Sequence, residues 1–236
     1  MNSAGEQACN TRLFLPLLVF LRMPYLNLDQ WPRRAHFDFY RTFEMPMFTV
    51  DVQVDVAPLK AWTDEHGASF FLAILYLSQQ AVHAVAPFRY RLRNDRVWVH
   101  DTVDAGATVL RDDDTFAFAY FEHAATFADF QKAGQSVIET ARASTGLTPR
   151  ENGDALIHYS VLPWLHFTGF QNARSGNPTA DAIPKIVFGQ YQHNHNSLQM
   201  PVSVTVHHAL LDGLHVGQYV EALSTYCAHP TAWLMQ

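Results

Sequence analysis

Residues 198–227 constrain the fold more than any other stretch, because a strand pattern passes directly into a helix pattern there. Apolar side chains alternate with Gln, Pro, Ser and Thr over residues 198–206, which is typical of a strand with one buried and one polar face. From Val216 to Cys227, apolar residues recur every three or four positions, as on one face of a helix. Asp212 lies between the two patterns and is a suitable helix N-cap. The stretch therefore predicts a strand, a short loop and a helix.

Two histidines follow the last apolar residue of the predicted strand. His208 is next in the apolar register, so we expect its side chain to point inward and that of His207 to point the other way. An imidazole is costly to bury unless its nitrogen atoms find partners. A core histidine bonded to the backbone and a histidine with a chemical role are both compatible with this position.

The segment from His207 to Gly213 has the form H-H-x-x-x-D-G, which resembles the signature of the coenzyme A-dependent acyltransferases. This class holds the chloramphenicol acetyltransferases and the dihydrolipoyl acyltransferases. Residues 29–40 resemble the W-x-R-x-x-H-F-x-x-Y segment that opens the chloramphenicol acetyltransferases, and residues 160–164 resemble their S-x-L-P-W strand. Similar blocks extend over residues 29–229 in the same order, which favours this family over the wider superfamily.

The remaining patterns predict one α/β domain. Helices are expected at residues 58–66, 70–85 and 126–144, and strands at residues 48–56, 90–92, 97–99, 108–111, 116–121, 157–162 and 185–192. Helices interspersed with strands that are distant in sequence indicate a single-domain two-layer sandwich with a mixed sheet, the fold that the resemblance also implies. We assign the acyltransferase domain to residues 28–236 and residues 1–27 to an N-terminal extension, with Met23 as a candidate native start.

Charge and cysteine content exclude several classes of protein. The net charge of -6 argues against a nucleic-acid partner, which would require a basic surface. The apolar run at residues 13–21 is shorter than the roughly 20 residues that span a bilayer, so no membrane partner is expected. Cys9 and Cys227 are too few for a disulfide framework, which agrees with a cytoplasmic location. The acidic residues 112–114 predict a solvated turn and not a metal site, since no other ligand cluster accompanies them.

The resemblance implies a reaction and roles for four residues. The reaction is the O-acetylation of chloramphenicol by acetyl-CoA, which confers antibiotic resistance, with direct transfer and no metal. His208 is the general base in this assignment, and the family holds its tautomer through the histidine's own backbone carbonyl. Ser160 donates a hydrogen bond to the oxyanion of the tetrahedral intermediate. Asp212 and Arg33 form an ion pair that supports the loop carrying the base.

The resemblance also implies the surroundings of the two substrates. Tyr191 matches a tyrosine along the cofactor channel. Four residues match positions that line the acceptor pocket, namely Phe39, Tyr40, Phe48 and Thr108. The family forms homotrimers with active sites between subunits, so we expect a homotrimer here.

Three positions depart from the family pattern. Two lysines near the cofactor appear as Ser69 and Gln190, and a threonine near the tetrahedral intermediate appears as Val187. These departures leave two alternatives open. One is the same chemistry on another hydroxylated small molecule, and the other is a non-catalytic binding relative.

Overall fold

The computed structural model describes residues 24–236 apart from residues 94, 151–152, 178–179 and 196. The helices are α1 (Arg34–Tyr40), α2 (Ala57–Glu65), α3 (Phe70–Ala84), α4 (Phe127–Ala143), α5 (Gly213–Ala228) and α6 (Pro230–Leu234), with 3-10 turns η1 (Leu28–Gln30), η2 (Ala86–Arg89) and η3 (Ala180–Ala182). The strands are β1 (Met47–Asp55), β2 (Tyr90–Arg93), β3 (Arg96–Val99), β4 (Asp104–Leu110), β5 (Phe116–Phe121), β6 (Leu156–Leu162), β7 (Lys185–Gly189), β8 (Gln192–Asn194) and β9 (Ser197–His207).

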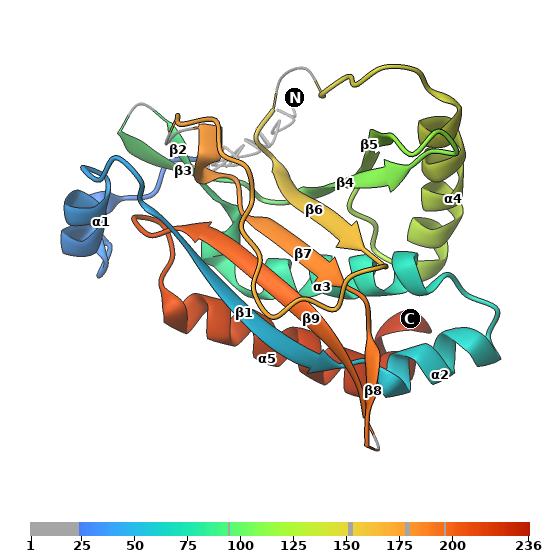
Figure 1. Cartoon of the computed structure of the whole chain (residues 1–236). Coiled ribbons are helices and arrows are strands. Elements are labelled where there is room, and N and C mark those ends of the chain that lie inside the picture. The colour runs from blue at the N-terminus through green and yellow to red at the C-terminus, as the bar shows by residue number, and fades with distance from the viewer. Residues whose placement is uncertain (1–23, 94, 151–152, 178–179, 196) are drawn as a thin grey trace, which may run out of the picture.

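One large sheet forms the centre of the chain (Figure 1). Its strand order is β1-β9-β7-β6-β4-β5, with β8 paired to β9 at one end. Strand β6 runs parallel to both of its neighbours, β4 and β7, whereas the other pairs are antiparallel. A separate hairpin of β2 and β3 lies off this sheet. The predicted mixed sheet is therefore confirmed.

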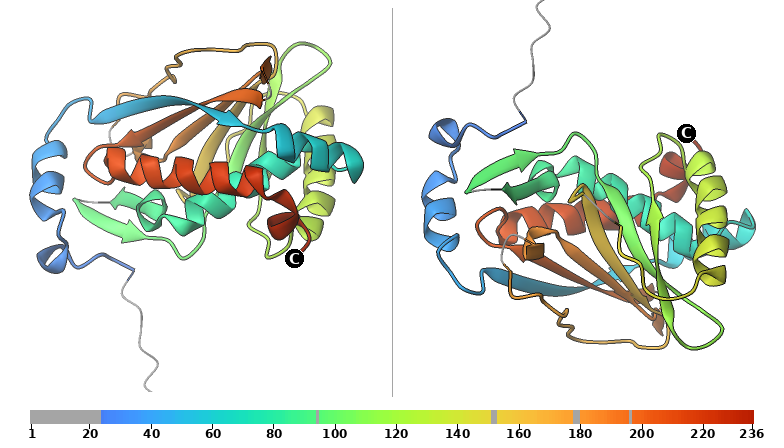
Figure 2. Two further views of the ribbon diagram at one scale, coloured as in Figure 1. Left: turned by 90° about the horizontal axis from the view of Figure 1, so that it is seen from below. Right: turned by 90° about the horizontal axis from the view of Figure 1, so that it is seen from above.

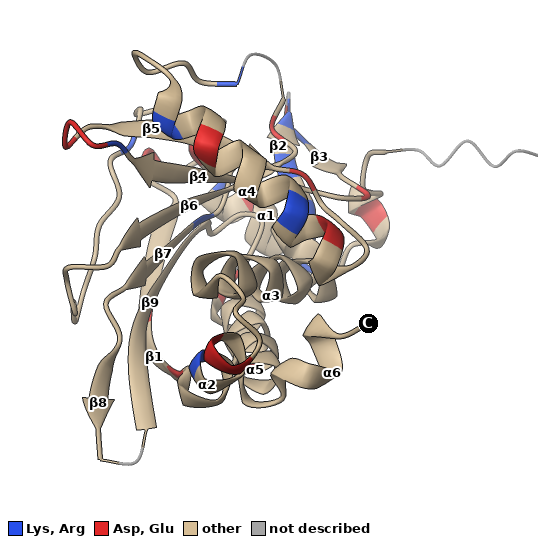
Figure 3. Cartoon of the chain, turned by 90° about the vertical axis from the view of Figure 1, so that its right-hand side faces the viewer, with Lys and Arg blue, Asp and Glu red and all other residues tan. Residues whose placement is uncertain are grey.

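Helices cover one face of the sheet and make the second layer (Figures 2 and 3). Helix α3 is buried from Leu72 to Gln79 because its sequence is apolar on nearly all sides, and it packs beside α5, α4 and α2 in the helical layer. Helix α5 presents Val216, Tyr219 and Leu223 to the same core. The chain is thus the expected two-layer α/β sandwich.

Strand β9 differs from its prediction because both of its faces are buried. Ser203 and Thr205, on the face that does not touch the helices, are 0% and 1% exposed. The segment between β6 and β7 passes over this face, which we call the outer face, and Asn172 Nδ2 donates to Thr205 Oγ1 at 3.2 Å. The polar face was therefore predicted correctly, but the expectation that only the apolar face is buried was wrong. The polar residues Ser203 and Thr205 are covered by the long connection between β6 and β7.

The proposed N-terminal extension meets the described fold at its last residues. Residues 1–23 lie outside the described residues. Tyr25 forms an isolated bridge with Trp98, and backbone bonds join Leu26 to Val97 and Pro24 to Val99 of β3. Residues 24–26 therefore belong to the folded body, although we had assigned them to the extension. Within the described residues, no helix combines the length and apolar character needed to cross a bilayer.

Candidate active site

His208 lies in the turn that leaves β9. Its backbone N–H donates to Pro46 O at 2.7 Å, and its ring Nδ1 lies 3.2 Å from Leu211 O. A carbonyl oxygen only accepts, so Nδ1 carries the proton and Nε2 keeps its lone pair. The expected partner was the histidine's own carbonyl, but the partner in the structure is Leu211 O, and the His208 carbonyl accepts from Arg33 Nη2 at 3.2 Å. The ring is nevertheless held in the tautomer that a base at Nε2 requires.

Aromatic side chains enclose the His208 ring. Tyr40 stacks on it with a centroid distance of 3.7 Å and an interplanar angle of 9°, and Phe48 lies 4.6 Å away. Phe39 contacts Tyr40 but is 59% exposed, so its ring lies further out. Phe43, which the motifs did not include, lies 5.2 Å from Tyr40 and extends the same wall. Packing on two sides restricts how the imidazole can turn.

Arg33 and Asp212 brace the same turn. Arg33 Nε lies 3.0 Å from Asp212 Oδ2, and Nη1 and Nη2 donate to Ala209 O and His208 O. Asp212 also caps α5, since its carboxylate accepts from Leu214 N at 3.0 Å and forms a capping box with His215. Burial alone would raise the pKa of Asp212, but the nearby His215 and Arg33 and the Leu214 N–H lower it below its usual value. Asp212 is therefore an anion that holds the turn to the helix.

His207 points to the outer face, away from the apolar register, as predicted, but it is 0% exposed because that face is covered, and His208, which was expected to point inward, is partly exposed. The strand ends at His207, so the turn carries His208 out of the strand register. Burial, together with the neighbouring His208, lowers the pKa of His207 to about 4. Its Nδ1 accepts from Ala209 N at 3.2 Å, so its proton is on Nε2.

Ser160 lies on the outer face, away from His208 within one chain. It is paired with Val187 on β7, which is paired with Ser203 on β9. Ser203 lies five residues before His208, so strand spacings place Ser160 about 20 Å from His208. Thr108 lies on β4 on the same face as Ser160, opposite Phe118 of β5. One chain therefore does not bring the proposed base and the proposed oxyanion donor together.

Tyr191 borders a cavity of about 330 Å³ at the start of α3. Its walls are mostly apolar, with Phe70, Phe71 and Phe188 among them, and Gln190 is a polar member. Ser69 does not line it, because its Oγ accepts from Leu72 N and caps α3. No described Lys or Arg lines this cavity. This apolar lining suits an apolar chain better than a phosphate.

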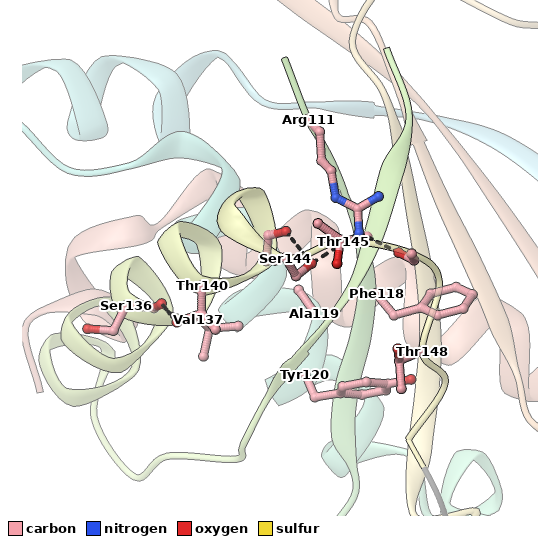
Figure 4. A pocket seen from close by; sticks show the side chains of 13 residues that line it. Arg111, Phe118, Ala119, Tyr120, Ser136, Val137, Thr140, Ser144, Thr145 and Thr148 are labelled. Carbon is pink, nitrogen blue, oxygen red and sulfur yellow. Dashed lines mark hydrogen bonds between the residues drawn. The ribbon is translucent and has the colours of Figure 1, made fainter. Parts of the chain in front are cut away.

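A second cavity, of about 390 Å³, lies between β5, α4 and the segment that follows α4 (Figure 4). Arg111 donates to Thr115, Phe116, Ser144 and Gly146, so its Nη groups are engaged by the chain itself. None of the predicted site residues lines this cavity. In the described part of the chain, no group of His, Cys, Asp or Glu is arranged to hold a metal ion.

A family model described as "Chloramphenicol acetyltransferase" matches residues 21–224. Chloramphenicol acetyltransferase 3 of Escherichia coli is 32% identical over 213 residues, which cover 87% of this chain and 98% of that protein. The chloramphenicol acetyltransferase of Bacillus pumilus is 29% identical over 208 residues, covering 87% and 94%.

Solved structures show the same similarity. A chloramphenicol acetyltransferase with 26% sequence identity superimposes with a TM-score of 0.73 and covers 86% of this chain and 98% of its own. A dihydrolipoamide acetyltransferase of Azotobacter vinelandii, 14% identical, has a TM-score of 0.63 and covers 86% of this chain and 88% of its own. That second likeness concerns the fold alone.

Proposed function

The chain belongs to the chloramphenicol acetyltransferase family, and on that premise we propose that it transfers the acetyl group of acetyl-CoA to the primary hydroxyl of chloramphenicol. In the cell this reaction would take place in the cytoplasm and confer resistance to the antibiotic. The observation that carries the proposal is the His208 ring, whose Nδ1 faces Leu211 O and whose Nε2 is left as a base.

His208 acts as a general base in the proposed mechanism. Its Nε2 takes the proton of the acceptor hydroxyl while the hydroxyl oxygen attacks the thioester carbonyl. The tetrahedral intermediate collapses, the carbon–sulfur bond breaks, and the proton passes from His208 to the departing thiolate. No covalent acyl-enzyme forms. Arg33 and Asp212 hold the turn that carries His208, so the base need not be reoriented during the reaction.

Ser160 is the proposed donor to the oxyanion of the intermediate. Its distance of about 20 Å from His208 in one chain, by strand spacing, supports a site built from two copies. Ser160 of one copy would then face His208 of another, as in the homotrimer that we propose. Static light scattering of the active enzyme tests this arrangement, and an active monomer would contradict it.

The substrates have separate surroundings in this proposal. Tyr40, Phe48 and Phe39 provide an aromatic wall beside His208 for a neutral aromatic acceptor, and Thr108 adds a hydroxyl from the Ser160 face. Tyr191 and the apolar cavity beside it take part of coenzyme A. A pantetheine chain needs few charged contacts, which agrees with a cavity that has none among its described lining residues.

Another hydroxylated small molecule is the second candidate acceptor. Val187 supports it, because this buried side chain stands directly opposite Ser160 and offers a methyl group where a hydroxyl was expected. The transfer chemistry would be unchanged, since His208 and the bracing pair do not involve this residue.

Release of coenzyme A, followed with a thiol reagent, tests these proposals. Purified protein, acetyl-CoA and chloramphenicol should release thiol, and His208→Ala should not. Release with another alcohol but not with chloramphenicol would reject the antibiotic as acceptor and keep the acetyltransferase. No release with any alcohol would favour the non-catalytic alternative.

A further inference from the structure

The Leu211–Asp212 peptide group joins the turn around His208 to the first turn of α5. Its carbonyl oxygen, Leu211 O, lies 3.2 Å from His208 Nδ1. Its amide nitrogen, Asp212 N, donates to His215 Nδ1 at 3.1 Å. The peptide bond is trans, so its C=O and N–H point in opposite directions within one plane. One peptide group therefore lies between two imidazole rings, with His208 on its carbonyl side and His215 on its amide side.

His215 occupies the position of α5 that a Glu or Gln usually fills in a capping box. Asp212 accepts from Leu214 N–H and caps the helix, and His215 in return accepts from the Asp212 N–H. The His215 side chain is only 14% exposed. An imidazole has fewer rotatable bonds than Glu or Gln and so loses less conformational entropy when it is held in place. The first turn of α5 thus fixes a hydrogen-bond acceptor against the peptide group.

The protonation state of His215 decides which atom of Asp212 its Nδ1 binds. Nδ1 lies 3.1 Å from Asp212 N and also 3.1 Å from Asp212 Oδ1. A neutral ring with its proton on Nε2 accepts from the N–H, whereas a protonated ring can only donate to the carboxylate. Burial and the charge of Arg33 lower the pKa of His215, although Asp212 acts in the opposite direction. The carboxylate already accepts from Arg33 and Leu214 N–H, so the neutral, accepting ring fits these surroundings at neutral pH.

We propose that His215 is a positioning residue for the general base and acts through the Leu211–Asp212 peptide group. The inference rests on the proposed function, in which His208 is the base. By accepting from Asp212 N–H, His215 keeps Leu211 O directed at His208 Nδ1, so the lone pair of His208 stays on Nε2. Hydrogen bonds in series also polarise one another, so a bond to the N–H makes the C=O of the same peptide a stronger acceptor.

Loss of this bond should act on the tautomer of His208. Without a partner for its N–H, the peptide group can turn about its flanking bonds, and Leu211 O is no longer held in one direction. His208 can then place its proton on Nε2 instead of Nδ1. In that tautomer Nε2 cannot take the proton of the substrate hydroxyl, so the fraction of enzyme that is ready to react falls.

Two substitutions separate the hydrogen-bond acceptor from the rest of the ring. His215→Gln keeps a neutral acceptor that reaches the N-cap N–H, as in an ordinary capping box. His215→Leu fills much of the same space but has no acceptor. His215→Leu should lower kcat for acetyl transfer about 3–10-fold, the effect of one lost hydrogen bond, with the KM of both substrates unchanged. His215→Gln should keep most of the wild-type kcat.

Thr126→Ala is the matched control for the loss of a helix cap. Thr126 Oγ1 accepts from Asp129 N at 3.2 Å and caps α4, which lies at the opposite end of the sheet from α1 (Figure 1). Both Thr126→Ala and His215→Leu should lower the melting temperature, but Thr126→Ala should leave kcat unchanged. A His215→Leu enzyme that is less stable but has the kcat of wild type would show that His215 only caps the helix, and would overturn the proposal. So would a His215→Gln enzyme as slow as His215→Leu.

Nitrogen NMR shifts of enzyme that is isotopically labelled in its histidine rings report the tautomer of His208 directly. The His208 signals are assigned by their loss in His208→Gln. Wild type and His215→Gln should carry the proton on Nδ1, and His215→Leu should show a population with the proton on Nε2. If His215→Leu does not fold, His215→Met takes its place, because a thioether is only a weak acceptor.

The tautomer decides the inference independently of the proposed function. A pure Nδ1 tautomer in the folded variant without an acceptor would overturn the role of His215, even if wild type is an active acetyltransferase. A wild type that releases no coenzyme A with any alcohol would reject the proposed function. The spectra of the same proteins would still show whether His215 sets the tautomer of His208.

Discussion

The two histidines at the end of β9 have opposite surroundings. His208 lies in a turn where Leu211 O, Arg33 and Tyr40 hold the ring and the backbone. His207 lies on the outer face among donors that lack acceptors within the described residues. The turn around His208 thus finds its hydrogen-bond partners within one chain, whereas polar atoms on the outer face around His207 have none among the described residues. One chain can preorganise a base, whereas the outer face leaves polar atoms unpaired among the described residues.

This difference has a structural cause. The turn is short, and residues 207–215 bond mainly to one another, with Arg33 and Pro46 as the distant partners. The outer face combines three strands with the connection between β6 and β7, so its polar groups come from segments far apart in the chain. In a short turn, neighbouring residues supply both the hydrogen-bond donors and their acceptors. On a face assembled from distant segments, the donors of one segment need not find acceptors on another.

The largest expected effect comes from removing the base. His208→Ala should lower kcat by about 10²–10⁴-fold, because the acceptor hydroxyl then has no group to take its proton. His207→Ala should cost much less activity, since its ring lies on the other face. Steady-state kinetics with acetyl-CoA and chloramphenicol measure both. Equal turnover by wild type and His208→Ala would show that His208 is not the base and that the turn carrying it is not the catalytic site.

The next effect concerns the brace of the turn. Arg33→Ala and Asp212→Ala should each lower the free energy of unfolding by about 2 kcal/mol, and the double mutant should be no worse than the poorer single mutant. The effect is smaller than for a fully buried pair because the Asp212 side chain is 31% exposed. Activity should fall in parallel. Urea unfolding is the measurement.

Arg34→Ala is the matched control for this brace. Arg34 is exposed and pairs with Asp38 and Asp29 on the surface, so its loss should leave the free energy of unfolding nearly unchanged. If Arg33→Ala were as harmless as Arg34→Ala, the ion pair with Asp212 would not support the turn.

A third test uses the pH dependence of stability to distinguish the outer face around His207 from the turn around His208. The folded chain keeps His207 neutral down to a pH of about 4, because burial lowers its pKa, whereas the unfolded chain takes up the proton near pH 6.5. Between these values the unfolded state binds more protons, so stability falls as the pH is lowered. His207 should contribute up to about 1 kcal/mol per pH unit between pH 6 and pH 5.

Urea unfolding at pH 7.5, 6.5 and 5.5 measures this slope. His207→Asn should flatten it but not abolish it, because burial also lowers the pKa values of His83 and His158 to about 4. An unchanged slope in His207→Asn would mean that His207 takes up its proton in the folded chain as readily as in the unfolded chain.

The smallest effect should come from Val187→Thr on the outer face. A hydroxyl at this position would lie between Ser160 and Ser203, whose Oγ has no partner among the described residues. One added hydrogen bond is worth about 1 kcal/mol, so turnover with chloramphenicol should rise by roughly 2–10-fold. Val204→Thr is the control, because it places a hydroxyl on the helix-covered face and should only destabilise. Unchanged turnover in Val187→Thr would show that no polar contact is missing there.

The sequence by itself determined the elements and most of the turn around His208. The hydrophobic periodicity predicted the bounds of β1, α3 and α5 to within a few residues. It could do so because an amphipathic pattern depends only on residues a few positions apart. The spaced motifs also singled out Arg33 and Asp212, which the structure joins at 3.0 Å. Asp212 was expected to cap its helix, and it does so through contacts with residues two and three positions away.

Only the tertiary structure decided which groups are covered and which side chains meet. The pattern of β9 predicted one buried and one polar face, but the polar face is buried as well at Ser203 and Thr205, where the connection carrying Asn172 passes over it. Leu211 replaced the expected carbonyl as the partner of His208, because the course of the turn decides which backbone oxygen the ring reaches. Burial and pairing of a polar group depend on segments distant in the chain, and a pattern of neighbouring residues carries no record of them.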